Sequence, residues 1–187
     1  MTETDLVKLL SERFHENFAD ETARAVLGAD GVELLYDLVA FRHGELPKPV
    51  RHKVLFRGAY VLERIYFTVP ERFMPRAAAF CRRDFPACAD PSARRHFGKI
   101  MADLLGRYVP EPGALERIAE AAAEWAVDPG SKVAVKVWAV EVLCRCRDRV
   151  GCRRIVGRHR GGGGGGCDAG PRVPAAQKLE TDMKKSP

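Results

Sequence analysis

Residues 90–105 read DPSARRHFGKIMADLL, a turn that contains proline followed by a segment with one apolar face. After the turn, apolar residues recur at intervals of three and four positions. They are Phe97, Ile100, Met101, Leu104 and Leu105. Since this spacing matches the α-helical period, the segment predicts a helix that buries one side and carries basic residues elsewhere.

Similar turns precede two other helical patterns, and the three turns are nearly evenly spaced. The related segments are PKPVR at residues 47–51 and DPGSKV at residues 128–133. The interval from Pro49 to Pro91 is 42 residues, and the interval from Pro91 to Pro129 is 38 residues. Periods near forty residues with two helices per unit are typical of α-solenoids, because each unit buries its apolar face only against its neighbours.

The remainder of residues 1–143 also follows the helical period. Proline or glycine separates the apolar segments at almost every turn, and no segment alternates with a period of two for long. Connections of a few residues force consecutive helices to pack antiparallel. The sequence therefore predicts an all-α domain built from helical hairpins, with apolar stripes at 6–14, 32–39, 50–66, 73–80, 97–105, 115–125 and 135–143.

The turns resemble those of HEAT-repeat proteins, in which Asp-Pro followed by Val-Arg or Ala-Arg opens the second helix of a repeat. The segment at residues 90–94 is the closest match, the segment at 128–136 is looser, and the first turn lacks the aspartate. The chain is also similar to small bacterial HEAT-like proteins. The resemblance covers residues 5–146 and implies a right-handed α-α superhelix of antiparallel helix pairs, the HEAT or armadillo-like architecture.

The composition changes abruptly after Leu143. Nine of the 17 glycines lie in residues 144–187, six of them at 161–166 among many arginines. We expect a HEAT-like domain at residues 1–146, a disordered basic Gly/Arg-rich linker at 147–174, and a short helix and tail at 175–187, because glycine at this density buries too little apolar surface. Three interpretations fit the linker: an arm that binds nucleic acid, a solvated tail, and the out-of-frame translation of a GC-rich gene.

Length and composition indicate one globular chain. Its 187 residues are 46% hydrophobic and 30% charged, which excludes collagen-like and wholly disordered classes. No run reaches the ~18 uncharged apolar residues of a membrane-spanning helix, and two acids precede the first apolar run. We therefore expect a cytoplasmic protein without membrane contact, whose six cysteines are reduced thiols.

Sequence motifs do not support catalysis, a metal or a cofactor. The chain has no HExxH, GxxxxGK[ST] or GxSxG pattern, and no GxGxxG between a strand and a helix. Four cysteines gather near the C-terminus, but only one pair is close, whereas structural zinc sites use two close pairs. These cysteines are Cys144, Cys146, Cys152 and Cys167. We expect no catalytic residue, no metal and no cofactor.

Charge is segregated within residues 1–143. The net charge of +6 comes from residues 144–187, which hold 11 basic and 4 acidic residues. Residues 1–143 hold 20 basic and 21 acidic residues. The resemblance makes 48–68, 91–108 and 131–143 the second helices of their repeats, on the concave side. These segments hold 11 basic and 3 acidic residues, whereas the rest of residues 1–143 holds 9 and 18. We predict a concave groove of positive potential that attracts acidic side chains or phosphate.

The candidate partner-binding residues are cations of these segments: Lys53, Arg57, Arg64, Arg95, Lys99 and Lys136. The first three and Lys99 have no evident intramolecular partner, so we expect them to bind. In HEAT repeats, a basic residue early in the second helix often bonds the turn aspartate of a neighbouring repeat. A structural interpretation therefore competes for Arg94, Arg95 and Lys136, which can pair with Asp90 and Asp128.

Four other residues have a simple structural interpretation. The helical spacing of Trp125 and Trp138 with neighbouring apolar residues places both rings in the core. His52 and His96 each follow an arginine in equivalent helices, which indicates a solvated basic face.

Three functions follow from these observations. The first is a non-catalytic interaction module that binds an acidic protein or peptide through the basic groove. The alternative is a nucleic-acid-binding protein, related in architecture to the alkylpurine DNA glycosylases of HEAT-like fold, with Trp125, Asp128 and Trp138 as candidates for the pocket of those enzymes. The third is an enzyme with a small-molecule substrate, which no motif supports.

Overall fold

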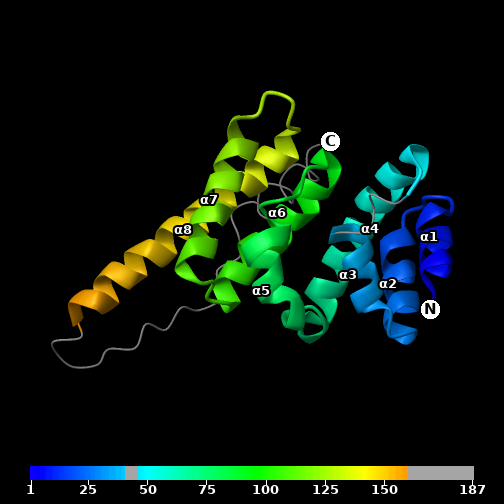
Figure 1. Cartoon of the computed structure of the whole chain (residues 1–187), viewed down its shortest axis with the longest axis horizontal. Helices are drawn as coiled ribbons and strands as arrows, with labels where there is room; N and C mark the ends of the chain where they lie inside the picture. The colour runs from blue at the N-terminus through cyan, green and yellow to red at the C-terminus, as the bar shows by residue number, and fades with distance from the viewer. Residues whose placement is uncertain (41–45, 160–187) are drawn as a thin grey trace, which may run out of the picture.

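The computed structural model describes residues 1–40 and 46–159, and every regular element in these two ranges is helical (Figure 1). The expected all-α class is confirmed for these residues. The α-helices are α1 (Glu3–Ser11), α2 (Phe18–Gly28), α3 (Val32–Ala40), α4 (Lys48–Thr68), α5 (Ala77–Ala79), α6 (Pro91–Arg107), α7 (Pro112–Val127) and α8 (Val133–His159). Between α4 and α6 lie the 3-10 turns η2 (Pro70–Arg72) and η3 (Met74–Arg76) and the π-helical turn η4 (Phe80–Asp84).

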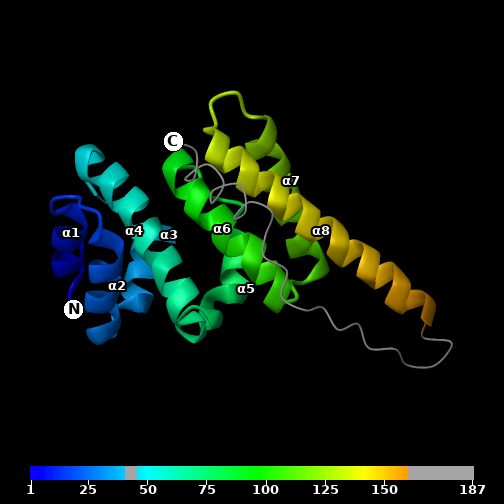
Figure 2. The same cartoon turned by 180° about the vertical axis from the view of Figure 1, so that it is seen from behind.

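Helices α4, α6 and α8 form one layer. Helix α4 packs against α6, and α6 packs against α8, as Figure 2 shows. Helices α1, α2 and α3 pack against α4, while α7 packs against both α8 and η4. The layer of α4, α6 and α8 consists of the three helices that follow the proline-containing turns of the sequence.

Asp90 connects the first two helices of this layer. Its Oδ1 accepts hydrogen bonds from the backbone N–H groups of Ser92 and Ala93, at 2.8 and 2.9 Å, and so caps α6. Its Oδ2 lies 3.1 Å from Nδ1 of His52 in α4. One carboxylate therefore starts its own helix and also contacts the preceding helix of the layer.

Asp128, in the next proline-containing turn, also contacts the preceding helix of the layer, while its other hydrogen bonds lie within its own turn and not at the first residues of α8. Its Oδ1 accepts a hydrogen bond from the backbone N–H of Gly130 at 2.8 Å, and its Oδ2 lies 3.5 Å from Nη1 of Arg94 in α6. The expected pairing of Arg94 with a turn aspartate is confirmed, and its partner is Asp128. Together, Asp90 and Asp128 link the turns before α6 and α8 to the first parts of α4 and α6, respectively.

The core is a continuous layer of apolar side chains between the two sets of helices. Trp125 and Trp138 are each 2% exposed, which confirms that both tryptophans belong to the core. A chain of aromatic rings crosses the core, with successive centroids 4.5 to 6.0 Å apart. It consists of Tyr36, Phe73, Phe80, Phe85 and Trp125.

The N-terminal helices differ from the sequence expectation. Helix α1 ends at Ser11, so Phe14 lies beyond it and is 46% exposed instead of completing the apolar stripe. A separate helix, α2, follows and buries mainly small side chains. Small residues give a weak periodic signal, which explains why the sequence pattern predicted no stripe where α2 lies.

The segment before α6 is also less regular than the single short helix that the apolar stripe at 73–80 predicts. Pro70 and Pro75 each stand in the first turn of a short 3-10 element, where the missing proline N–H costs no helical hydrogen bond. The π-helical turn then carries Asp84 into the core, where its Oδ2 accepts a hydrogen bond of 2.6 Å from the hydroxyl of Tyr36.

Helix α8 continues to His159, beyond the domain end expected at residue 146. The part of the linker at 160–174 and the short helix and tail at 175–187 lie outside the described residues. Among the described helices, none combines the length and the apolar character that crossing a membrane requires.

Candidate functional site

Cations gather at the edge where α4, α6 and α8 begin. The first turns of these three helices contain no acidic residue in the sequence. We call the following set the basic edge: Lys48, Arg51, Lys53, Arg94, Arg95, Lys132 and Lys136. Three of the six candidate residues, Lys53, Arg95 and Lys136, belong to it.

The electrostatics of this edge favour anions. The N-terminal end of a helix carries a partial positive charge, so three helices that begin side by side add to the field of the cations. Asp90 and Asp128 offset part of this field within the turns. The pKa of Asp128 is held below its usual range by the N–H of Gly130 and the hydroxyl of Ser131, with help from the charges of Arg94 and Lys136.

Most of the lysines of the basic edge are accessible to a partner. Lys48, Lys53 and Lys132 are exposed, as is Arg95, while Lys136 is half-buried. Arg94 has a structural role, because its Nε donates to the carbonyl of Cys88 at 3.0 Å and its guanidinium lies 5.2 Å from the centroid of Trp125. The lysines therefore offer the largest accessible positive charge of the edge.

Arg57 does not lie free in a groove. Its Nη1 donates to the carbonyl oxygens of Leu10, at 2.9 Å, and Glu12, at the C-terminal end of α1. Its guanidinium also covers the rings of Phe14 and Phe18, at 5.5 and 5.4 Å from their centroids. The expectation that Arg57 lacks an intramolecular partner is therefore wrong, because this side chain fastens α1 to α4.

The same correction applies to Arg64 and Lys99. Nε of Arg64 donates to Oδ1 of Asp20 in α2 at 2.8 Å. Nζ of Lys99 lies 3.0 Å from Oε1 of Glu63 in α4. It also lies 5.8 and 5.7 Å from the ring centroids of Phe67 and Trp138, so Lys99 contacts both neighbouring helices of its layer.

A buried charged cluster lies between α4 and α6. Glu63 is 5% exposed and His96 is 4% exposed, and Oε2 of Glu63 lies 2.6 Å from Nδ1 of His96. The ring of His96 stacks on Tyr60 with centroids 5.0 Å apart. Burial alone would raise the pKa of Glu63, but the hydrogen bonds and charges of His96 and Lys99 outweigh burial and hold this pKa below its ordinary value.

The position of His96 overturns the expectation of a solvated face for this residue. His52 is exposed, whereas His96 faces α4. The sequence held no local signal for the cluster, since Glu63 and His96 are 33 positions apart, with the end of α4 and the irregular segment before α6 between them. Nε2 of His96 has no hydrogen-bond partner among the described residues.

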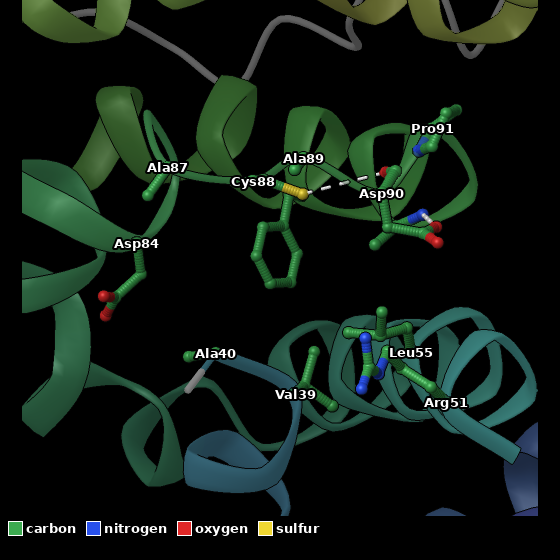
Figure 3. Close-up of a pocket in the computed structure, with 12 residues that line it drawn as sticks. Val39, Ala40, Arg51, Leu55, Asp84, Ala87, Cys88, Ala89, Asp90 and Pro91 are labelled. Atoms are coloured by element: carbon green, nitrogen blue, oxygen red, sulfur yellow. Dashed lines mark hydrogen bonds between the residues drawn. The ribbon is translucent and has the colours of Figure 1, made fainter. Parts of the chain in front are cut away.

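A cavity of about 360 Å³ opens beside the basic edge (Figure 3). It lies between the end of α3, the beginning of α4, residues 84–91 and the beginning of α6. Most of its wall is apolar and includes four alanines, while Arg51 stands on one side. Cys88 also lines it, and burial raises the pKa of this thiol to about 12, so that the wall there is neutral.

The described residues do not hold a group of three or more side chains arranged to bind a metal ion. Burial raises the pKa of Cys81 to about 12 and that of Cys146 to about 11, which keeps both as thiols. The three residues considered for a glycosylase pocket have other contacts. Trp125 and Trp138 are buried, and the carboxylate of Asp128 serves its turn.

Comparison of the chain with protein-family models, with curated proteins and with solved structures gave no match.

Proposed function

We propose that this protein is a non-catalytic interaction module, a short HEAT-like α-solenoid, that binds an acidic protein or peptide through the basic edge. The observation that carries the proposal is the placement of cations in or next to the first turns of three adjacent helices, turns that themselves contain no acidic residue. Cations at this end of a helix oppose its dipole and cost stability. An anionic partner would recover that cost.

The repeated turn contacts support the solenoid part of the proposal. Asp90 with His52, and Asp128 with Arg94, join a turn aspartate to the third residue after the proline of the preceding turn. The same contact thus recurs with the sequence repeat, as stacked repeats require.

The side chains around the edge favour a peptide over a nucleic acid. Proteins that bind single strands stack bases on accessible aromatic rings. Trp125 and Trp138, the two tryptophans of the chain, are buried in the core, and the exposed rings of Phe14 and Phe67 do not belong to the basic edge. An apolar cavity instead lies beside the cations, and an apolar cavity suits an amino-acid side chain.

Charge reversal at the exposed lysines tests this function. The variant Lys48→Glu/Lys53→Glu/Lys132→Glu changes side chains that are exposed, so the fold should persist. Fluorescence anisotropy of a labelled oligoglutamate peptide, measured with the full chain over a salt series, should show binding that weakens as salt rises. The variant should bind roughly tenfold more weakly or worse, because like charges then face each other.

A matched control reverses three exposed cations away from the edge, Lys8→Glu/Arg13→Glu/Arg82→Glu. This control has the same net charge as the test variant, so it corrects for the general attraction of the basic C-terminal residues. Equal loss of binding in both variants would remove the basic edge from the proposal. Labelled single-stranded and duplex DNA are measured in parallel, and tighter edge-dependent binding of DNA would replace the peptide by a nucleic acid.

A further inference from the structure

We infer that the cavity beside the basic edge receives one large apolar side chain of an acidic partner peptide, whose carboxylates face the lysines of the edge. This inference rests on the proposed function and adds a specificity to it: the partner is an acidic segment interrupted by an apolar residue.

The cavity and the basic edge share parts of the chain. Arg51 lines the cavity, and Lys48 stands one helical turn before it and is exposed. Asp90 and Pro91, at the start of α6, form the opposite wall. Figure 3 shows Arg51 and Leu55 facing Cys88 and Ala89 across the cavity. A peptide lying across the beginnings of α4 and α6 therefore passes the cavity and the cations together.

The chemistry of the wall favours an apolar occupant. Val39, Leu55 and Phe97 supply apolar surface. Asp84 is the buried carboxylate among the residues that line this cavity. Its oxygens already accept hydrogen bonds from the hydroxyl of Tyr36 at 2.6 Å and from Nε of Arg83 at 2.7 Å. Arg51 also lines the cavity, but its Nη2 already donates to the carbonyl oxygen of Leu46 at 3.0 Å. A carboxylate inside the cavity would therefore give up its hydration for at most this one cationic partner, whereas a hydrocarbon or aromatic group has little hydration to lose.

The size of the cavity fits one large side chain. Its volume of about 360 Å³ stands at the lower end of the roughly 300–1,000 Å³ that binding pockets span. The space exists because small side chains line it, namely Ala40, Ala87, Ala89 and Ala93. Larger side chains at these positions would fill it from within.

The spacing of residues along an extended peptide determines where the acidic residues of the partner must lie relative to its apolar residue. An extended chain advances ~3.3 Å per residue, so side chains two or three positions from the apolar anchor lie ~7–10 Å from it. Lysine side chains reach across such distances, and Lys48 is one helical turn from the cavity wall. The inferred partner therefore carries Asp or Glu on one or both sides of a Leu, Ile, Met, Phe or Trp.

Selection from a displayed library of random linear peptides on the full-length protein tests the inference without assuming a partner. The expected sequences are rich in acids and share one large apolar residue. A labelled selected peptide should lose ~10-fold to 100-fold in affinity when alanine replaces its apolar residue, because the burial of that side chain is lost. This measurement needs no change in the protein.

Two protein variants supply the reciprocal test. Ala87→Phe and Ala89→Phe introduce a ring from positions that line the cavity yet are exposed, so either can be accommodated without disturbing the core. Both should weaken the selected peptide, while Ala123→Phe, an exposed alanine of α7, should not. Circular dichroism and thermal melting confirm that each variant keeps its fold.

The outcomes separate this inference from the proposed function. Acidic peptides that bind Ala87→Phe and Ala89→Phe as tightly as the wild type, or that tolerate loss of their apolar residue, would overturn the cavity and leave the acidic partner in place. Selected peptides without acids, or peptides unaffected by Lys48→Glu/Lys53→Glu/Lys132→Glu, would overturn both.

Discussion

Glu63 is the most deeply buried acid of the α4–α6 interface, and its environment explains how it is tolerated. Each carboxylate oxygen has one partner from α6: Oε2 lies 2.6 Å from Nδ1 of His96, and Oε1 lies 3.0 Å from Nζ of Lys99. Removing a carboxylate from water costs roughly several kcal/mol, unless an opposite charge and hydrogen-bond donors replace the lost water. The position of α6 against α4 is therefore linked to the charge of one side chain.

Replacement of this charge should destabilise the protein strongly. Glu63→Gln keeps the size of the side chain but leaves Lys99 without a buried counter-charge, so we expect a loss of about 3 kcal/mol at neutral pH. The pKa of Glu63 is lowered, so its ionisation contributes stability above the unfolded value of 4.5, and this contribution disappears as pH falls through the folded pKa. The difference between wild type and Glu63→Gln should therefore shrink in acid.

Urea unfolding followed by circular dichroism at a series of pH values measures this difference. Glu71→Gln, which changes an exposed glutamate just after α4, is the matched control and should shift the midpoint by little. A constant difference between wild type and Glu63→Gln down to strongly acidic pH would contradict the assignment of Glu63 as an ionised partner.

The roles of single cations were only partly predictable from the sequence. Arg94 could be assigned because its turn repeats along the chain. Arg57 and Arg64 could not, because their partners lie in or just after α1 and in α2, which the repeat pattern does not align with α4. Lys99 could not, because its partner Glu63 lies near the end of α4, away from the repeated turns. A cation without a local partner in sequence is thus weak support for a binding role.

At the scale of elements, α6 is the helix on which the layer depends, because it lies between α4 and α8. Its Gly98 allows close approach: a Cβ atom there would lie 2.9 Å from Cβ of Trp138 in α8. Cβ of Trp138 is fixed to the backbone, so it cannot move without moving α8. Gly106, in the last turn of the same helix, has open space around it.

These two glycines should therefore respond oppositely to the same substitution. Gly98→Ala should lose about 1–3 kcal/mol through overpacking, despite the better helix propensity of alanine. Gly106→Ala meets no neighbour and should gain about 0.5–1 kcal/mol from reduced backbone entropy. Midpoints of thermal unfolding measure both, and a stabilising Gly98→Ala would show that α6 and α8 are not in close contact.

The elements themselves were predictable where their apolar residues are large. The stripes at 50–66, 97–105 and 115–125 became α4, α6 and α7, because Leu, Ile and aromatic side chains give a clear helical period. Helix α2 was not predicted, and the turns η2, η3 and η4 were not distinguished from a single short helix. Apart from Phe18, helix α2 buries only Ala, Thr and Val side chains. The turns follow from Pro70 and Pro75 and from the hydrogen bond between Asp84 and Tyr36.

At the scale of the whole molecule, the basic residues and the helix contacts both follow the order of α4, α6 and α8 in the chain. The cations of the basic edge stand on the layer of α4, α6 and α8, and each of these helices contacts the next. If the stack behaves as a solenoid, stability is a sum of local contributions from each unit and its neighbours. Damage at one end should then stay near that end.

Amide hydrogen exchange tests whether destabilisation at one end of the stack stays near that end. Trp125 is 2% exposed and its ring centroid lies 4.5 Å from that of Phe85, so Trp125→Ala should cost about 3–5 kcal/mol in the unit that contains α7. We expect amides of α6, α7 and α8 to exchange much faster, while amides of α1, α2 and α3 change little. Leu35→Ala, in fully buried surroundings in α3, is the reciprocal variant and should accelerate exchange in the first four helices instead. An equal acceleration in every helix from either variant would mean that the chain unfolds as one cooperative unit, and the solenoid proposal would fail.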